Sequence, residues 1–175
     1  DGIVVRVVEV DVIRNPGHDV LRRDLQFAII SDIENCIIDM LVLSPPCASW
    51  SRSLFNRRVK GPLPLRSRTH PWGFPWLTGV RKANLMRAKE LTKCATKVIE
   101  TACLAGVGVM LEQPEDLGRY YTGSCPASIW QLPKLKEWLS GLRRLAGLSI
   151  SPRTGQIHQS LRGFGPPSTC TRTLG

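Results

Sequence analysis

The chain has 175 residues, of which 42% are hydrophobic and 22% charged; this composition fits one globular domain and excludes a disordered chain. Its 24 Lys and Arg against 14 Asp and Glu give a net charge of +10, which favours a polyanionic partner such as nucleic acid. No apolar run reaches transmembrane length and no signal peptide opens the chain, so we expect no membrane association.

The first predicted element is a strand over residues 3–12, because this segment is rich in Val. Glu9 and Asp11 lie near its end, two residues apart and therefore on one face. Carboxylates at such strand ends often accept ribose hydroxyls in nucleotide-binding α/β folds. An ordinary solvated strand end is the simpler explanation here. Turn residues follow at 14–17, and residues 27–30 are a candidate for a second β segment.

The apolar residues 40–43, which follow Asp39, are followed in turn by Ser44-Pro45-Pro46-Cys47. Their length and the turn residues that follow predict a fully buried strand of a parallel sheet. The strand should stop at Ser44, since two prolines cannot continue a ladder. Cys47 would then lie at the carboxyl end of the strand, where open α/β sheets bind ligands. Cys47 is either a nucleophile or, like most free cysteines, a small buried apolar side chain.

Residues 40–89 contain no Asp or Glu but hold ten basic residues. These are Arg52, Arg57, Arg58, Lys60, Arg66, Arg68, Arg81, Lys82, Arg87 and Lys89. The interleaved aromatic residues are Phe55, Trp72, Phe74 and Trp76. Four prolines between residues 62 and 75 predict a loop, and long loops in compact domains are usually functional or disordered. We therefore interpret residues 52–79 as an insertion that contacts phosphates and stacks on bases, rather than a solvated loop with tucked-in tryptophans.

A long helix is predicted over residues 80–105, since apolar residues recur there at steps of three and four, with Gly106 as its cap. Residues 107–111 then predict a second strand, with Glu112 at its carboxyl end. Two strands joined by a helix form the βαβ arrangement, which brings both carboxyl ends to one rim. We therefore expect the side chains of Cys47 and Glu112 to face one cleft.

The six cysteines show no CxxC pair and no metal-ligand spacing. We therefore expect reduced thiols, no metal and an intracellular location. Residues 133–145 predict an amphipathic helix, and residues 151–175, rich in Pro, Gly, Ser and Thr, predict a poorly ordered tail. The expected organisation is a core over residues 1–150, followed by this tail.

Two segments, DMLVLSPPCASWS around Cys47 and LEQPED around Glu112, resemble the cytosine-C5 DNA methyltransferase family. That family has a strand, then Pro-Cys, then Ser four residues later, here Pro46, Cys47 and Ser51. It also has a later Glu at a strand end. The resemblance implies that Cys47 is the catalytic nucleophile and that Glu112 protonates the base. The Trp-rich insertion looks closer to phage- or mobile-element-type members.

The same resemblance implies an S-adenosylmethionine site in which Glu9 meets the ribose, Asp24 the adenine, and Pro46 lines the cofactor. It also implies DNA contacts from Arg162, whose segment, residues 159–162, resembles the family's Gln-x-Arg-x-Arg element. The expected nucleic-acid-binding residues are Ser51, Arg52, Arg57, Arg58, Arg66, Arg68 and Arg162.

The sequence departs from the family pattern in three places. The family's opening strand and glycine-rich cofactor loop would precede Glu9, where only eight residues stand. Glu112 is followed by Gln-Pro rather than Asn-Val, and no separate target-recognition domain is visible. We expect a methyltransferase-like, Rossmann-type three-layer α/β sandwich with a mostly parallel sheet, without that first strand and loop.

The expected function is S-adenosylmethionine-dependent methylation of cytosine C5 in DNA through a covalent Cys47 adduct, active or vestigial. This chain alone is expected to be inactive, and RNA stays open as the substrate. The alternatives are a non-catalytic nucleic-acid-binding remnant of such a domain, or an unrelated α/β domain in which Cys47 is structural.

Overall fold

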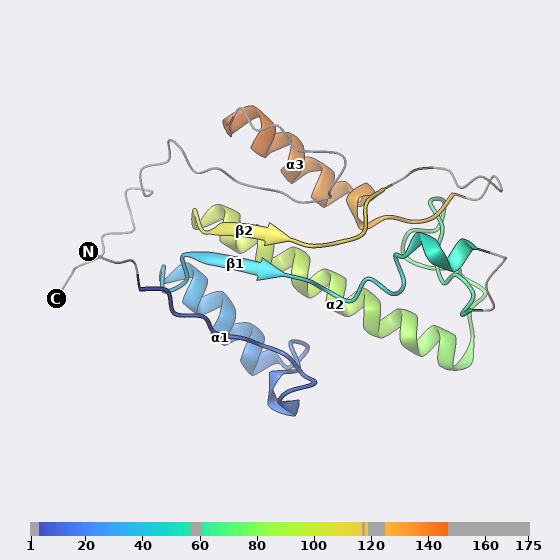
Figure 1. Ribbon diagram of the computed structural model, residues 1–175, viewed down its shortest axis with the longest axis horizontal. Helices are drawn as coiled ribbons and strands as arrows, with labels where there is room; N and C mark the ends of the chain where they lie inside the picture. The colour runs from blue at the N-terminus through green and yellow to red at the C-terminus, as the bar shows by residue number, and fades with distance from the viewer. Residues whose placement is uncertain (1–3, 57–60, 117, 119–124, 147–175) are drawn as a thin grey trace.

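The computed structural model describes residues 4–56, 61–116, 118 and 125–146, with the backbone alone for residues 141–146. These residues form a mixed α/β arrangement of three α-helices and a two-stranded parallel sheet (Figure 1). In chain order the elements are α1 (Arg23–Glu34), β1 (Met40–Leu43), α2 (Gly79–Leu104), β2 (Gly108–Leu111) and α3 (Pro133–Ala146). The short 3-10 helices are η1 (Pro16–His18), η2 (Arg52–Phe55) and η3 (Ile129–Gln131).

The two strands pair in parallel, with Met40 opposite Gly108 and Leu43 opposite Leu111. Parallel strands need a long crossover connection, and here that connection contains α2. At the end of α2, Gly106 adopts a positive φ of 74°, which lets the chain reverse into β2. The predicted order of strand, helix and strand, and the parallel pairing, are therefore confirmed.

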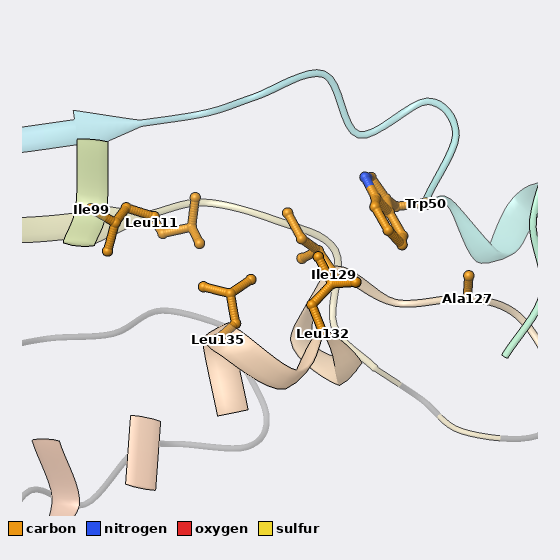
Figure 2. Close-up of a cluster of buried hydrophobic side chains, with 7 residues drawn as sticks. All are labelled: Trp50, Ile99, Leu111, Ala127, Ile129, Leu132 and Leu135. Atoms are coloured by element: carbon orange, nitrogen blue, oxygen red, sulfur yellow. The ribbon is translucent and has the colours of Figure 1, made fainter. Parts of the chain in front are cut away.

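The core consists of two clusters that share α2. In one, Ile33 of α1 is buried with Val98 and Ala102 of α2 and with Val107. In the other, Ile99 of α2 packs with Leu111 of β2 and with residues from the loops and α3 (Figure 2). The members of this second cluster are Trp50, Ile99, Leu111, Ala127, Ile129, Leu132 and Leu135. Because the adjacent residues Val98 and Ile99 of α2 enter different clusters, this helix packs against α1 on one side and against the cluster of Leu111 and α3 on the other.

The strand predicted over residues 3–12 is wrong. Residues 4–11 have no regular structure, and their valines are exposed, with Val4 94% accessible. Valine favours strands because it fits a pleated, half-buried surface, and within the described residues no strand pairs with this segment. The candidate β segment at 27–30 is also wrong, since these residues lie in α1, where Ile29 and Ile33 share the inward face one turn apart.

The predicted full burial of the strand before Ser44, which is β1, is wrong as well. Met40 and Val42 of β1 are exposed, while Leu41 and Leu43 pack toward the core. Only one side of the strand is therefore covered by described residues. β1 is one of only two strands in the described part of the chain. The described residues therefore bear out a mixed α/β arrangement and no specific fold.

The segment before α2 is fixed against that helix at Gly73. This residue has a φ of +108°, and a Cβ added to it would lie 2.1 Å from Cδ2 of Leu85. We expect Gly73→Ala to lower the free energy of unfolding by about 2–4 kcal/mol, because it adds both backbone strain and overpacking. Gly61→Ala is the matched control, since nothing lies within 4 Å of its added Cβ. Equal urea midpoints for the two variants would contradict this close approach.

Candidate active site at the carboxyl ends of the strands

The carboxyl ends of β1 and β2 are tied together by hydrogen bonds. The backbone N–H of Glu112 donates to the carbonyl of Leu43 at 2.9 Å, which extends the ladder beyond β2. The hydroxyl of Ser44 donates to Oε2 of Glu112 at 2.7 Å. The amide of Gln113 donates to the carbonyl of Pro45. The parallel pairing thus places the first polar residue after β1 beside the first acid after β2.

Sequence reasoning did not single out Ser44 or Gln113 as site residues. A signal was available for Ser44, because it follows β1 at the same register position at which Glu112 follows β2. Gln113 had none, since its contact to Pro45 depends on how the chain leaves each strand. Both residues hold the two strand ends in a fixed relation.

Cys47 lies in a turn that is anchored from one side. The backbone N–H of Trp50 donates to the carbonyl of Cys47 at 2.8 Å, which closes the turn. The indole of Trp50 is buried in the core (Figure 2), whereas Pro46 and Cys47 are exposed. The turn therefore presents an accessible thiol from a backbone that is fixed to the core.

Arg66 was expected on the nucleic-acid surface, but it is buried, with 1% of its surface accessible. Its guanidinium lies 3.9 Å from the centre of a Trp50 ring. Its Nε donates to Oγ of Ser49 and its Nη1 to the carbonyl of Pro71, each at 3.1 Å. Burial lowers the pKa of Arg66 to about 10. Arg66 thus clamps the turn of Cys47 to the insertion and is not accessible to a phosphate.

The remaining nucleic-acid-binding candidates differ in exposure and in their partners. Ser51 caps η2, its Oγ accepting the N–H of Ser53 at 3.2 Å. Arg52 lies in that helix and is half-buried. Arg68 is exposed and forms an ion pair with Asp116 at 3.6 Å. Three further candidates fall outside the described residues: Arg57, Arg58 and Arg162.

The acids expected to bind the cofactor are engaged by arginines instead. Glu9 lies in the irregular N-terminal segment rather than at a strand end, and Arg14 pairs with it at 2.8 Å. Asp24 lies in the first turn of α1, where Nε of Arg22 donates to its Oδ1 at 3.1 Å. This hydrogen bond lowers the pKa of Asp24. Both acids are exposed.

Cys47 differs from the other described thiols in its exposure. Cys47, Cys94, Cys103 and Cys125 are free, and only Cys47 among these four is exposed. Cys36 is disulfide-bonded, so the expectation of reduced thiols is wrong at this position, and Cys170 lies outside the described residues. Burial raises the pKa of the Cys94 and Cys103 thiols, which lowers their thiolate fraction.

We therefore expect native-state alkylation by N-ethylmaleimide to modify Cys47 before Cys94 and Cys103, by roughly tenfold or more in rate. Peptide mass spectrometry at a series of times would measure this order. Denatured protein is the control, because unfolding removes the difference in accessibility. Faster native-state labelling of Cys94 would mean that the thiol of Cys47 is not exposed in solution.

Comparison of the chain with protein-family models, curated proteins and solved structures gives no match. Within the described residues, every helix is too short or too polar to cross a membrane. The same residues contain no group of three His, Cys, Asp or Glu side chains that could hold a metal ion. Function must therefore be inferred from the chemistry of the strand ends and of the insertion.

Proposed function

We propose that this chain performs the covalent step of cytosine-C5 methylation in DNA, with Cys47 as the nucleophile and Glu112 as the proton donor. The observation that supports this most is the bond between Ser44 and Glu112. It holds a carboxyl group at the edge of the sheet from which the exposed turn of Cys47 departs. Covalent catalysis requires that the nucleophile and the acid reach the same substrate ring. Residues that follow adjacent parallel strands are suited to this, because both strands end at one edge of the sheet.

The chemistry needs both groups because carbon 5 of cytosine is too electron-poor to accept a methyl group directly. Addition of a Cys47 thiolate at C6 forms a carbon–sulfur bond and moves electron density to C5. A proton on N3, donated by Glu112, neutralises the charge that this addition creates. After methylation, a water molecule takes the C5 proton, the freed electron pair restores the C5–C6 double bond, Cys47 leaves as the thiolate, and the N3 proton returns to Glu112. The thiol and carboxyl group thus act before and after the transfer itself.

The methyl donor of this reaction class is S-adenosylmethionine, and the described residues do not fit it. The ribose and adenine acceptors implied by the resemblance are Glu9 and Asp24. Arg14 and Arg22 already pair with them, and Glu9 is in an irregular, exposed segment. We therefore assign no step through the cofactor and confine the mechanism to Cys47, Glu112 and Ser44. The proposed fold is a three-layer methyltransferase-like sandwich, of which β1, α2 and β2 form one βαβ unit.

Transfer of a labelled methyl group from S-adenosylmethionine to cytosine in duplex DNA tests the proposal. Label recovered at C5 supports it, and RNA of the same sequence distinguishes the two substrates. If folded protein binds both S-adenosylmethionine and DNA but transfers no label, catalysis is excluded and binding alone is left.

Non-catalytic nucleic-acid binding is the second candidate, and a separate observation favours it. Arg68, Arg81 and Lys82 are exposed on a stretch that carries no acidic residue. Exposed cations of this kind neutralise phosphates and make affinity depend on salt. Because this binding needs neither the thiol nor the cofactor, Cys47→Ala should leave it unchanged. Binding without transfer would identify this second function.

A further inference from the structure

Three aromatic rings of the insertion form a compact cluster. Phe74 and Trp76 stack with their ring centres 4.8 Å apart and their planes 15° from parallel. His70 meets the edge of this pair, 5.7 Å from Phe74 and 5.5 Å from Trp76. Trp76 is nevertheless 65% exposed. A tryptophan that is supported by one stacked ring and still largely accessible offers its remaining surface to a second flat ring.

The backbone holds this cluster in place. The N–H of Phe74 donates to the carbonyl of Leu65 at 3.0 Å, and the N–H of Gly73 to that of His70 at 2.9 Å. The side chain of Leu77, immediately after Trp76, is buried. These contacts fix the rings before any ligand arrives. A preorganised aromatic surface loses less conformational entropy on binding than a mobile one.

The same stretch connects to the turn of Cys47. Arg66 follows Leu65 in the chain. It donates to the hydroxyl of Ser49 and to the carbonyl of Pro71, which lies between His70 and Phe74 in the sequence. The insertion lies beyond the arrowheads of β1 and β2 (Figure 1). The ring cluster is therefore joined through Arg66 to the backbone that carries the proposed nucleophile.

The charges around the cluster indicate the class of ligand. Residues 61–89 contain six Lys and Arg and no Asp or Glu, and Arg81 is fixed near the loop by donating to the carbonyl of Pro64 at 3.0 Å. Arg68 and Arg87 pair with Asp116 and Asp19, whereas Arg81 and Lys82 are exposed. An apolar protein partner would gain nothing from such exposed cations. A chain with flat rings and regularly spaced phosphates matches both features at once, and single-stranded nucleic acid is such a chain.

We infer that Trp76, supported by Phe74 and His70, is a stacking platform for an unpaired base of a single-stranded nucleic acid. The inference deepens the proposed function and rests on it for the nucleic-acid substrate. A base in a duplex is already stacked on its neighbours, so the platform should select single-stranded or locally opened regions. Stacking tolerates every base, because each has a π face.

Fluorescence anisotropy of a labelled oligothymidine, titrated with the full chain without cofactor, tests this inference. Trp76→Ala should weaken binding by about 5- to 150-fold, the range for loss of one stacking aromatic. Trp76→Phe should keep most of the affinity. Trp72→Ala is the matched control, since Trp72 is 38% exposed in the same loop but lies outside the three-ring cluster.

An oligonucleotide of equal length with abasic sugars separates stacking from phosphate attraction. Trp76→Ala should leave affinity for this strand unchanged, and the salt dependence of oligothymidine binding should stay the same. Equal losses on the two strands would overturn the platform and assign Trp76 a structural role. Binding to anionic phospholipid vesicles that depends on Trp76, without such dependence for oligothymidine, would overturn it in favour of a lipid surface. These binding measurements do not depend on methyl transfer. Loss of transfer would therefore contradict the proposed function without contradicting the stacking platform.

Discussion

In a form of this protein that binds S-adenosylmethionine, replacing Cys47 with alanine is expected to abolish methyl transfer to cytosine, lowering the rate by roughly 10³-fold or more. The thiolate forms the only covalent bond that makes C5 nucleophilic in the proposed reaction, and loss of a covalent nucleophile has effects of this size. Because Cys47 is exposed in a turn, its truncation removes little packing, and the urea midpoint should stay close to that of the original chain. Labelled-methyl incorporation into DNA is the measurement.

Two variants make this result specific. Cys103→Ala removes a half-buried thiol from α2 and should retain transfer. Glu112→Gln keeps an oxygen that can accept the Ser44 hydroxyl but removes the acid, and it should lower the rate by roughly 10²- to 10⁴-fold. Undiminished transfer by Cys47→Ala would assign the chemistry to another residue. A similar loss in all three variants would point to instability instead.

The part of the fold that the sequence predicts well is the unit from β1 to β2. Its signals reinforce one another: a long apolar stripe ends at Gly106, and a short apolar run on each side ends in proline. The preferred handedness of βαβ connections leaves few other arrangements. The neighbouring positions of Ser44 and Glu112 follow directly from that parallel register.

The errors arise where burial decides the structure. The valines of residues 4–11 have strand propensity, but such propensity acts through packing against a partner, and no described strand supplies one. Residues 27–30 are equally apolar, yet Ile33 beyond them is fully buried against α2. That contact favours a helix with a one-sided apolar face over a short strand. Strand propensity is calculated from the residues of a segment alone, whereas the conformation that the segment adopts depends on what it packs against.

Arg66 shows the same limit at the candidate site. In sequence it is one of ten basic residues in an acid-free stretch, and nothing distinguishes it from Arg68 two positions later. In the structure Arg66 is buried on Trp50, and Arg68 is exposed beside Asp116. Charge patterns therefore predicted the character of the insertion but could not assign which arginine builds the loop and which faces solvent.

Arg66→Ala is expected to lower the free energy of unfolding by about 2–4 kcal/mol, since it leaves a cavity over Trp50. It also removes two hydrogen bonds to a charged donor, which reach Ser49 and the carbonyl of Pro71. The cost of burying the guanidinium charge opposes these losses, because the variant no longer has that charge. The lowered pKa of Arg66 corresponds to a desolvation cost of roughly 3 kcal/mol for the charged form. The cavity decides the sign, because truncation to alanine removes the packing of the whole side chain.

Arg66→Met separates packing from charge. Methionine fills much of the same volume without a buried cation, so its loss of hydrogen bonds should be nearly offset by the relief of desolvation. We expect the free energy of unfolding of Arg66→Met to lie within about 1 kcal/mol of that of the original chain, and therefore well above that of Arg66→Ala. Arg68→Ala is the surface control, and its exposed ion pair with Asp116 should contribute about 1 kcal/mol or less. Urea unfolding followed by tryptophan fluorescence measures all three variants. If Arg66→Ala behaves like Arg68→Ala, the guanidinium is not buried in solution, and the insertion is not clamped to the turn of Cys47.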